Sequence, residues 1–325
     1  MPVDVLGGTA IRPIQREGWE AISFFLYDKS TGAIMGRTPK SWALIIGFYI
    51  IYYILLAAFW ALCMFVFFKT IDDTVPKWTT AESLIGTSGA LGIRPNQSDE
   101  FIDSSMIIFN QAAEGKTVTG GVAGWKEWAE RTNKFLEKYR TSKGVDCTSE
   151  EPGPGKFCKF PLESLGPCGQ DNFGYDLGKP CIYLKMNKIY GLIHSYYNDT
   201  ADLPEELPTD LKLSMAKLTG EELNQIWVNC HPENPADKEG LGDIEYFPKS
   251  AGFHDKYFPF KNQANYLGPL VAVQFQNPTA GQLLHIECRA YAKNILYSKR
   301  DKLGIAHFEL LIHNEATAKK ADAEL

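Results

Sequence analysis

The longest apolar run in the chain extends from residue 42 to residue 68. It contains no charged side chain, and nearly every position is aliphatic or aromatic. A helix needs about 20 such residues to cross the hydrocarbon core of a bilayer, so this run can span a membrane with some tilt. No second run of comparable length exists in the sequence. The pattern predicts a single-span membrane protein with a tail of residues 1–41 and a transmembrane helix of residues 42–68.

The spacing of apolar residues changes after the span. Residues 69–98 are rich in Thr, Ser, Gly and Pro and predict a stalk or loop, whereas residues 125–139 carry apolar side chains on one helical face and charges on the other. Further on, apolar and polar residues alternate, which is typical of half-buried antiparallel strands. The alternating segments are residues 270–275, 284–291 and 306–313. We therefore expect a β-rich ectodomain over residues 99–313 with one amphipathic helix, followed by a mobile tail of residues 314–325.

Cysteines and glycosylation sequons predict the orientation. Six of the seven cysteines follow the span, and an even set in a large portion of chain indicates disulfides formed in an oxidising compartment. Two Asn-x-Ser/Thr sequons, at Asn96 and Asn198, lie on the same side. The first 41 residues have no signal-peptide pattern, so the span itself is the expected insertion signal. The sequence thus predicts type II topology, with a cytoplasmic N-terminus and an extracellular or lumenal C-terminus.

One pair of cysteines bears on the fold. Cys230 ends the strand-like "IWVNC", and Cys288 lies on the apolar face of residues 284–291. A bridge between two sheets at these positions is expected, and several strands joined by one such bridge suggest an immunoglobulin-like antiparallel sandwich.

Charge excludes one class of partner. The net charge is −6, and the tail carries five basic and four acidic residues, so the portion beyond the span is acidic. An acidic surface repels the phosphate backbone, and no nucleic-acid partner is expected.

Motifs for catalysis are absent or incomplete. The stretch from Asp28 to Gly32 resembles the loop that P-type pumps phosphorylate, but the residue order differs. A tail of 41 residues is too short for the nucleotide-binding domain that phosphoryl transfer needs, so a juxtamembrane turn is the better interpretation. There is no His-Glu-x-x-His, and the outer cysteines are better used as disulfides than as zinc ligands. We expect no catalytic residues, no metal and no cofactor.

The apolar span has two different faces. Large side chains spaced three or four residues apart share one face, and small or aliphatic side chains lie opposite. The first set is Tyr49, Tyr53, Leu56, Trp60, Met64 and Phe67, and the second is Gly47, Ile51, Ile54, Ala58 and Ala61. Aromatic residues can anchor a helix at the lipid interface, and Tyr49 fits that role, but Tyr53 and Trp60 lie too deep. We predict helix–helix contact, with Tyr49, Tyr53, Trp60 and Phe67 on the principal partner and the Gly47/Ala58/Ala61 face open to a small single-span regulatory subunit.

Several of these segments together resemble the β subunits of Na,K-ATPase and related P-type cation pumps. The juxtamembrane "LYD…MGRTPKSW" resembles the family's signature, and "FYIIYY" resembles its aromatic transmembrane start. The most specific match is "FGYDLGKPCIYLKMNKIYG", and "LVAVQFQN" with "IECRAYAKNI" resembles the terminal strands. The resemblance covers nearly the whole chain.

The resemblance implies a non-catalytic partner in a heterodimer with a catalytic α subunit. Such a subunit lets α fold, leave the endoplasmic reticulum and reach the plasma membrane, and it tunes potassium occlusion and affinity. It also implies sequential disulfides, Cys147–Cys158, Cys168–Cys181 and Cys230–Cys288, where the sequence alone permits 15 pairings. The family's aromatic α-contact patch matches Tyr257, Phe258, Pro259 and Phe260, where two hydroxyls of the family's pattern are lost.

Three alternatives stay open at this point. The chain could serve an H⁺/K⁺ pump, because the resemblance extends to those β subunits. It could be a cell-adhesion protein, because immunoglobulin-like folds do not fix function. A type II ectoenzyme such as a glycosyltransferase is disfavoured, because no Asp-x-Asp motif occurs.

Overall fold

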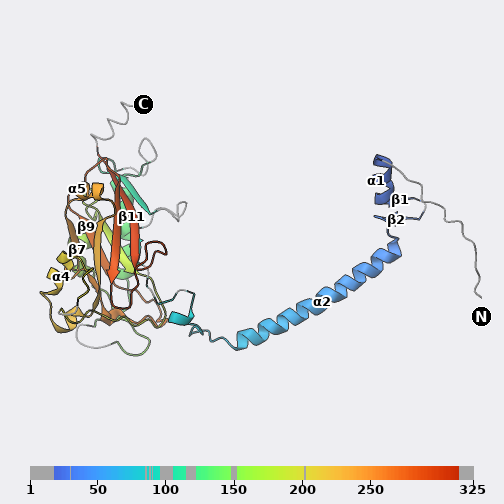
Figure 1. The fold of residues 1–325 in the computed structure, drawn as a ribbon, viewed down its shortest axis with the longest axis horizontal. Coiled ribbons are helices and arrows are strands. Elements are labelled where there is room, and N and C mark those ends of the chain that lie inside the picture. Colours follow the sequence, from blue (N-terminus) through green and yellow to red (C-terminus); the bar gives the residue numbers. More distant parts are fainter. Residues whose placement is uncertain are drawn as a thin grey trace, which may run out of the picture. The chain divides into compact units, whose positions relative to one another are not determined.

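The structure is a computed structural model that describes residues 18–29, 31–84, 86–87, 89, 91–95, 105–114, 122–147, 152–200 and 203–314. Asn96 and residues 315–325 of the expected C-terminal tail lie outside the described residues. The chain divides into two compact units, Met1–Asp72 and Asp73–Leu325, each of which is described here by itself. Figure 1 traces both units along the chain.

The first unit contains the apolar helix and a small hairpin before it. Its elements are α1 (Trp19–Leu26), β1 (Tyr27–Asp28), β2 (Ala33–Ile34) and α2 (Pro39–Lys69). Pro39 opens α2 at a position where its missing N–H costs nothing, and Lys69 places a cation at the negative end of the helix dipole. The helix starts three residues before the predicted span and ends one residue after it. It is the one helix among the described residues that is long and apolar enough to cross a membrane.

Asp28 is the last residue of β1 and immediately precedes the turn that leads to β2. Tyr27 pairs with Ile34 and Asp28 with Ala33, and the Thr31 hydroxyl donates a hydrogen bond of 2.7 Å to the Asp28 carboxylate. The structure therefore confirms the interpretation of this stretch as a juxtamembrane turn.

The second unit contains two β-sheets. A five-stranded sheet has the order β4-β11-β10-β6-β8, and a four-stranded sheet has the order β3-β5-β9-β7. The bounds of the first sheet are β4 Met106–Asn110, β11 Ile305–His313, β10 Leu284–Tyr291, β6 Gln225–Pro232 and β8 Gly252–His254. Those of the second are β3 Leu91–Arg94, β5 Cys181–Met186, β9 Leu270–Phe275 and β7 Ile244–Phe247.

One strand pair departs from the expected antiparallel arrangement. β4 and β11 run parallel, with Ile107 opposite Leu310 and Phe109 opposite Ile312, whereas the other pairs in both sheets are antiparallel. No hairpin joins these two strands, because nearly the whole domain lies between them in sequence. Either direction therefore satisfies the backbone at this sheet edge.

The two sheets face each other across one hydrophobic core. Phe275 of β9 and Phe308 of β11 meet edge to face with their ring centroids 6.2 Å apart, and both side chains are fully buried. On β11, buried and partly exposed positions alternate as the sequence predicts. Alternation thus correctly identifies the inward face of the five-stranded sheet.

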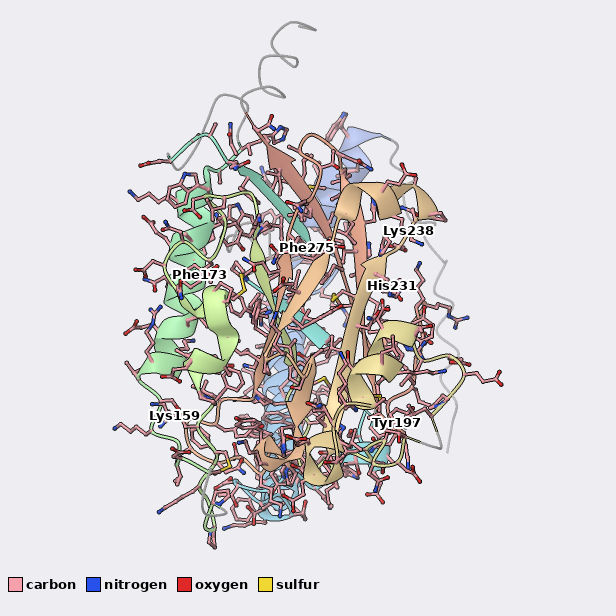
Figure 2. All side chains as sticks on the ribbon, turned by 90° about the vertical axis from the view of Figure 1, so that its left-hand side faces the viewer. Lys159, Phe173, Tyr197, His231, Lys238 and Phe275 are labelled. Carbon is pink, nitrogen blue, oxygen red and sulfur yellow. A yellow bond between two sulfur atoms is a disulfide. The ribbon has the colours of Figure 1, made fainter. Side chains whose placement is uncertain are left out.

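The four-stranded sheet is covered on its other face as well. Helix α3 (Trp125–Arg140) packs there, with Phe135 against Tyr183 of β5 at 6.0 Å between ring centroids and the Tyr139 hydroxyl bonded to the Gly268 carbonyl. Figure 2 shows α3 in green along the side of the domain next to the strands that include Phe275. Helix η3 (Leu162–Gly169) contacts β9. Every residue of β9 is buried, so the expectation of a half-buried strand is wrong for residues 270–275.

The structure contains the three disulfides that the resemblance implies, Cys147–Cys158, Cys168–Cys181 and Cys230–Cys288. The sequence context of the third disulfide predicts a bridge between two sheets, and this prediction is wrong. Cys230 and Cys288 are register partners on β6 and β10, which are neighbours in one sheet. The alternating pattern identifies the face on which each cysteine lies but not the strand that lies beside it.

Short helices complete the domain. They are η1 (Thr80–Glu82), η3 (Leu162–Gly169), α4 (Thr209–Met215), η4 (Gly220–Leu223), η5 (Pro235–Asp237), α5 (Lys238–Leu241) and η6 (Asp255–Tyr257). Helix α4 contributes Leu211 and Met215 to a second, smaller core with Trp227 and Tyr291.

Candidate partner-binding surfaces

The described residues of its own unit leave the aromatic face of α2 exposed. Tyr49 and Tyr53 stack one turn apart, with ring centroids at 6.1 Å. Tyr49, Tyr53, Trp60 and Phe67 are 49, 60, 63 and 45 % exposed, and α2 has no buried residue at all. A row of large rings on a rigid helix offers ridges that fit the grooves of another helix.

The opposite face of α2 carries smaller side chains, which project less far from the helix axis. A Cβ atom added at Gly47 would meet nothing within 4 Å, and Ala58 and Ala61 are exposed. Small side chains in this row let a second backbone approach closely. The two faces can therefore take two different neighbours at once.

The predicted ectodomain patch is less available than its sequence indicates. Tyr257 is only 7 % exposed and belongs to the main core, where its ring lies 5.8 Å from that of Phe160. Burial raises the pKa of its phenol to about 12. Its backbone carbonyl accepts a hydrogen bond of 2.7 Å from the Tyr266 hydroxyl. Tyr257 thus supports the patch from within the core.

The other members of this patch are half-buried and hold a neighbouring loop. Phe258 meets His194 edge to face at 4.9 Å, and Phe260 lies 5.1 Å from Tyr266. The Phe260 carbonyl accepts a hydrogen bond of 2.8 Å from the Gly191 amide. These contacts fix the segment, so a partner would meet a rigid surface that includes Pro259.

A groove runs beside the same patch. Residues 152–158, at the end of the loop that the first disulfide closes, line one part of it, and residues from 254 to 263 line another. Exposed Lys156, Lys256 and Lys261 border it, together with Glu221. The groove therefore offers charged side chains of both signs beside the patch.

Two basic side chains near this patch are buried or partly buried and have lowered pKa values, which the sequence does not reveal. Burial, reinforced by Lys188, Arg94 and Lys138, lowers the pKa of Lys185 to about 8. Burial also lowers the pKa of His194 to about 4. The Lys188 ammonium donates to the Tyr266 carbonyl at 2.8 Å and lies over the Phe260 ring. Nothing in the spacing of these residues along the chain brings them together; only the fold does.

Three histidines, each beside a carboxylate, form a polar cluster on neighbouring strands of the five-stranded sheet. His231 Nε2 lies 3.7 Å from Glu287, His285 Nδ1 lies 3.2 Å from Asp237, and His307 Nε2 lies 2.7 Å from Glu233. In register, Glu287 stands between His231 on β6 and His307 on β11. These histidines are scattered in sequence, so strand register is the signal that would have found them. No group of three or more His, Cys, Asp or Glu among the described residues is arranged to hold a metal ion.

The predicted glycosylation sites are placed only in part. Asn198 is exposed, with its side-chain oxygen 3.5 Å from the Lys293 ammonium. Asn96 lies outside the described residues.

These features define a class of protein: a membrane-anchored, disulfide-bonded β domain whose spanning helix presents an uncovered aromatic face. A family model described as the sodium/potassium ATPase β chain matches residues 12–308. The chain belongs to this family.

Similar proteins occur across animals. Subunit beta-2 of the sodium/potassium-transporting ATPase of Drosophila melanogaster is 38 % identical over 314 residues, which cover 93 % of this chain and 94 % of the relative. Subunit beta-1 of the same organism is 39 % identical over 300 residues, 90 % and 93 % of the two chains. The human subunit beta-2 is 30 % identical over 312 residues, 89 % and 93 %. The chain is therefore a non-catalytic β subunit of a Na⁺/K⁺-transporting ATPase, and this family implies association with the catalytic α subunit of the pump.

Proposed function

We propose that this chain lets the catalytic α subunit fold, leave the endoplasmic reticulum and reach the plasma membrane, and that it tunes potassium occlusion. The observation that carries the proposal is the aromatic face of α2, whose rings the described residues of its own unit leave exposed. A partner that binds only folded α stabilises it by mass action. Filling a lipid-facing groove of α also shields its polar transmembrane groups.

We propose that Tyr49, Tyr53, Trp60 and Phe67 contact the α subunit in the membrane. Outside the membrane, Pro259 contacts the α subunit together with Phe258 and Phe260, and Tyr257 supports these residues from the core. The Gly47/Ala58/Ala61 face accepts a small single-span regulatory subunit. Serving an H⁺/K⁺ pump is the second candidate function, because the resemblance of this sequence extends to the β subunits of those pumps.

The topology we propose is type II, with the domain after residue 69 outside the cytosol and Asn96 and Asn198 as glycan acceptors. Three disulfides support this orientation, because the cytosol keeps thiols reduced. The fold class we propose for the domain is an immunoglobulin-like sandwich, on the basis of its two facing sheets. Asn198→Gln should remove one glycosidase-sensitive mobility step of the full chain, and an unchanged mobility would contradict the use of that site.

The test of the main proposal compares two faces of one helix. Tyr53→Ala with Trp60→Ala should reduce co-purification of α and its delivery to the cell surface. Leu55→Ala with Leu62→Ala is the matched control, because both leucines are more than half exposed on a different face of α2. Loss of α with the control pair alone, or normal surface α after depletion of this chain in cells without a paralogue, would refute the proposal.

A further inference from the structure

The short segment before the spanning helix forms a defined unit. In residues 18–38, the Met35 amide donates to the Leu26 carbonyl at 3.2 Å, which joins the hairpin to α1. The Trp42 indole donates to the Ile34 carbonyl at 2.8 Å, which joins the hairpin to the first turn of α2. We call residues 18–38 the juxtamembrane unit. Its hydrogen bonds hold it at the N-terminal end of the span.

This unit exposes an apolar stripe. Trp19, Ile22 and Leu26 are spaced i, i+3 and i+7 on one face of α1, with Phe25 at its edge. They are 84, 49, 52 and 54 % exposed, in the order Trp19, Ile22, Leu26 and Phe25. A helix of 8 residues has little stability of its own in water, because most helical stability comes from packing of the apolar face. An uncovered stripe of this kind marks a surface that something covers.

The length of α2 identifies what covers it. A helix of 31 residues is about 46 Å long at 1.5 Å per residue, and the hydrocarbon core is about 30 Å thick. The ends of α2 therefore reach the headgroup regions, and the juxtamembrane unit is hydrogen-bonded to one of those ends. Trp19 and Tyr27 of this unit, and Trp42 in the first turn of α2, are residue types that concentrate at this level of a bilayer.

Charge points to the same occupant. Lys29, Arg37 and Lys40 are exposed around the turn and the start of α2. Basic side chains beside an apolar helix face favour binding to a surface of anionic lipid. The Asp28 carboxylate nearby already accepts a hydrogen bond from Thr31.

We propose that α1 lies in the membrane interface, with its Trp19/Ile22/Leu26 stripe at the boundary between lipid headgroups and acyl chains. The juxtamembrane unit is then a second membrane anchor that sets the depth and rotation of α2. It would orient the aromatic face of α2 before any partner binds.

The test uses the full chain in lipid nanodiscs of phosphatidylcholine. Cys63 is the one free cysteine among the described residues, so Cys63→Ser allows selective labelling of a new cysteine. A fluorescent NBD probe is attached after Trp19→Cys or, as a water-exposed reference, after Lys217→Cys. Lipids with a shallow doxyl group should quench the probe at position 19 several-fold more than at position 217, and aqueous iodide should show the opposite preference.

Two further arms sharpen the result. Ile22→Asp with Leu26→Asp should restore iodide access at position 19, and partial replacement of phosphatidylcholine by phosphatidylserine should increase lipid quenching there. Equal iodide access at positions 19 and 217 would overturn the proposal, because α1 would then project into water. Protection from both quenchers would also overturn it, because a protein surface, such as a second copy of the chain, would then cover the stripe.

This experiment is independent of the proposed function. The α subunit is absent, and both leaflets have the same lipid, so neither pump assembly nor topology affects the outcome. Unchanged disulfide-dependent mobility on a non-reducing gel shows that each variant has kept its folded domain.

Discussion

Two helices of this chain use aromatic residues in opposite ways. In α3, Trp128 is 1 % exposed and its indole donates a hydrogen bond of 2.8 Å to the Ile108 carbonyl. In α2, Trp60 is 63 % exposed and no residue of the helix is buried. Helix α3 completes the core of its own domain, whereas α2 leaves its rings available to another molecule.

The solvent explains the difference. In water, polarity separates the two faces of α3, because charged side chains remain hydrated while apolar ones pack. In lipid, apolar side chains gain nothing from leaving their surroundings, so polarity cannot mark the contact face. The size of side chains carries that information in α2, with large rings on one face and Gly47, Ala58 and Ala61 on the other.

The comparison is tested most strongly by removing a tryptophan from each helix. Trp128→Ala should lower the free energy of unfolding of the second unit by about 3–5 kcal/mol, because it leaves a large cavity in the core and an unpaired carbonyl. Trp60→Ala should leave that free energy unchanged within about 0.5 kcal/mol. Urea unfolding of the detergent-solubilised chain, followed by circular dichroism, measures both. A large loss with Trp60→Ala would show that α2 packs within the chain.

Disulfides sharpen the comparison, because all three lie in the second unit. Replacing Cys230 and Cys288 by Ala should lower the free energy of unfolding by about 4 kcal/mol, and replacing Cys147 and Cys158 should lower it by about 3 kcal/mol. The difference arises because the Cys230–Cys288 bond closes a sequence separation of 58 residues and the Cys147–Cys158 bond one of 11. The same unfolding assay ranks them. Cys63→Ser in α2 is the control, and an equal loss from it would contradict the division of the chain into two units.

The sequence predicts where the helices and strands lie along the chain better than it predicts which of them lie side by side. The span, the helix at residues 125–139 and the three alternating segments all appear close to their predicted positions. The pattern could not tell that helices cover the outer face of the four-stranded sheet, that β4 lies parallel to β11, or that Cys230 and Cys288 share a sheet. Each of these depends on pairing across long stretches of chain, which a period of two or 3.6 residues does not encode.

The candidate site shows the same limit. The aromatic face of α2 follows directly from helical spacing, because the described residues of its own unit leave it exposed. The Tyr257 patch is different, because the run of aromatic letters is continuous while the fold buries Tyr257 and pairs Phe258 with His194. The resemblance supplied the position of the patch, and only tertiary packing decides which of its rings remain accessible.

Low pH should have the smallest effect on stability. It tests the comparison because the two regions differ in buried ionisable groups. Helix α2 has no ionisable carboxylate, whereas Asp237 of the second unit is 6 % exposed. Burial alone would raise the pKa of Asp237, but hydrogen bonds from the His285 backbone and from the Asn234 and His285 side chains bring it below its usual value. The folded state therefore binds this proton less tightly than the unfolded state does.

The sign of the pH effect follows from that difference. The stability that Asp237 contributes should be complete above about pH 4, the pKa of an unfolded aspartate, and should be lost as the pH falls through the lower folded value. Asp237→Asn should reduce stability at neutral pH and flatten this acid-side loss, while the exposed Asp171→Asn should change neither. Unfolding free energies of the three chains measured from pH 7 to pH 3 test this. An equally steep loss in the Asp237→Asn chain would assign the acid sensitivity to other groups, such as Glu233, whose pKa the Lys299 hydrogen bond lowers.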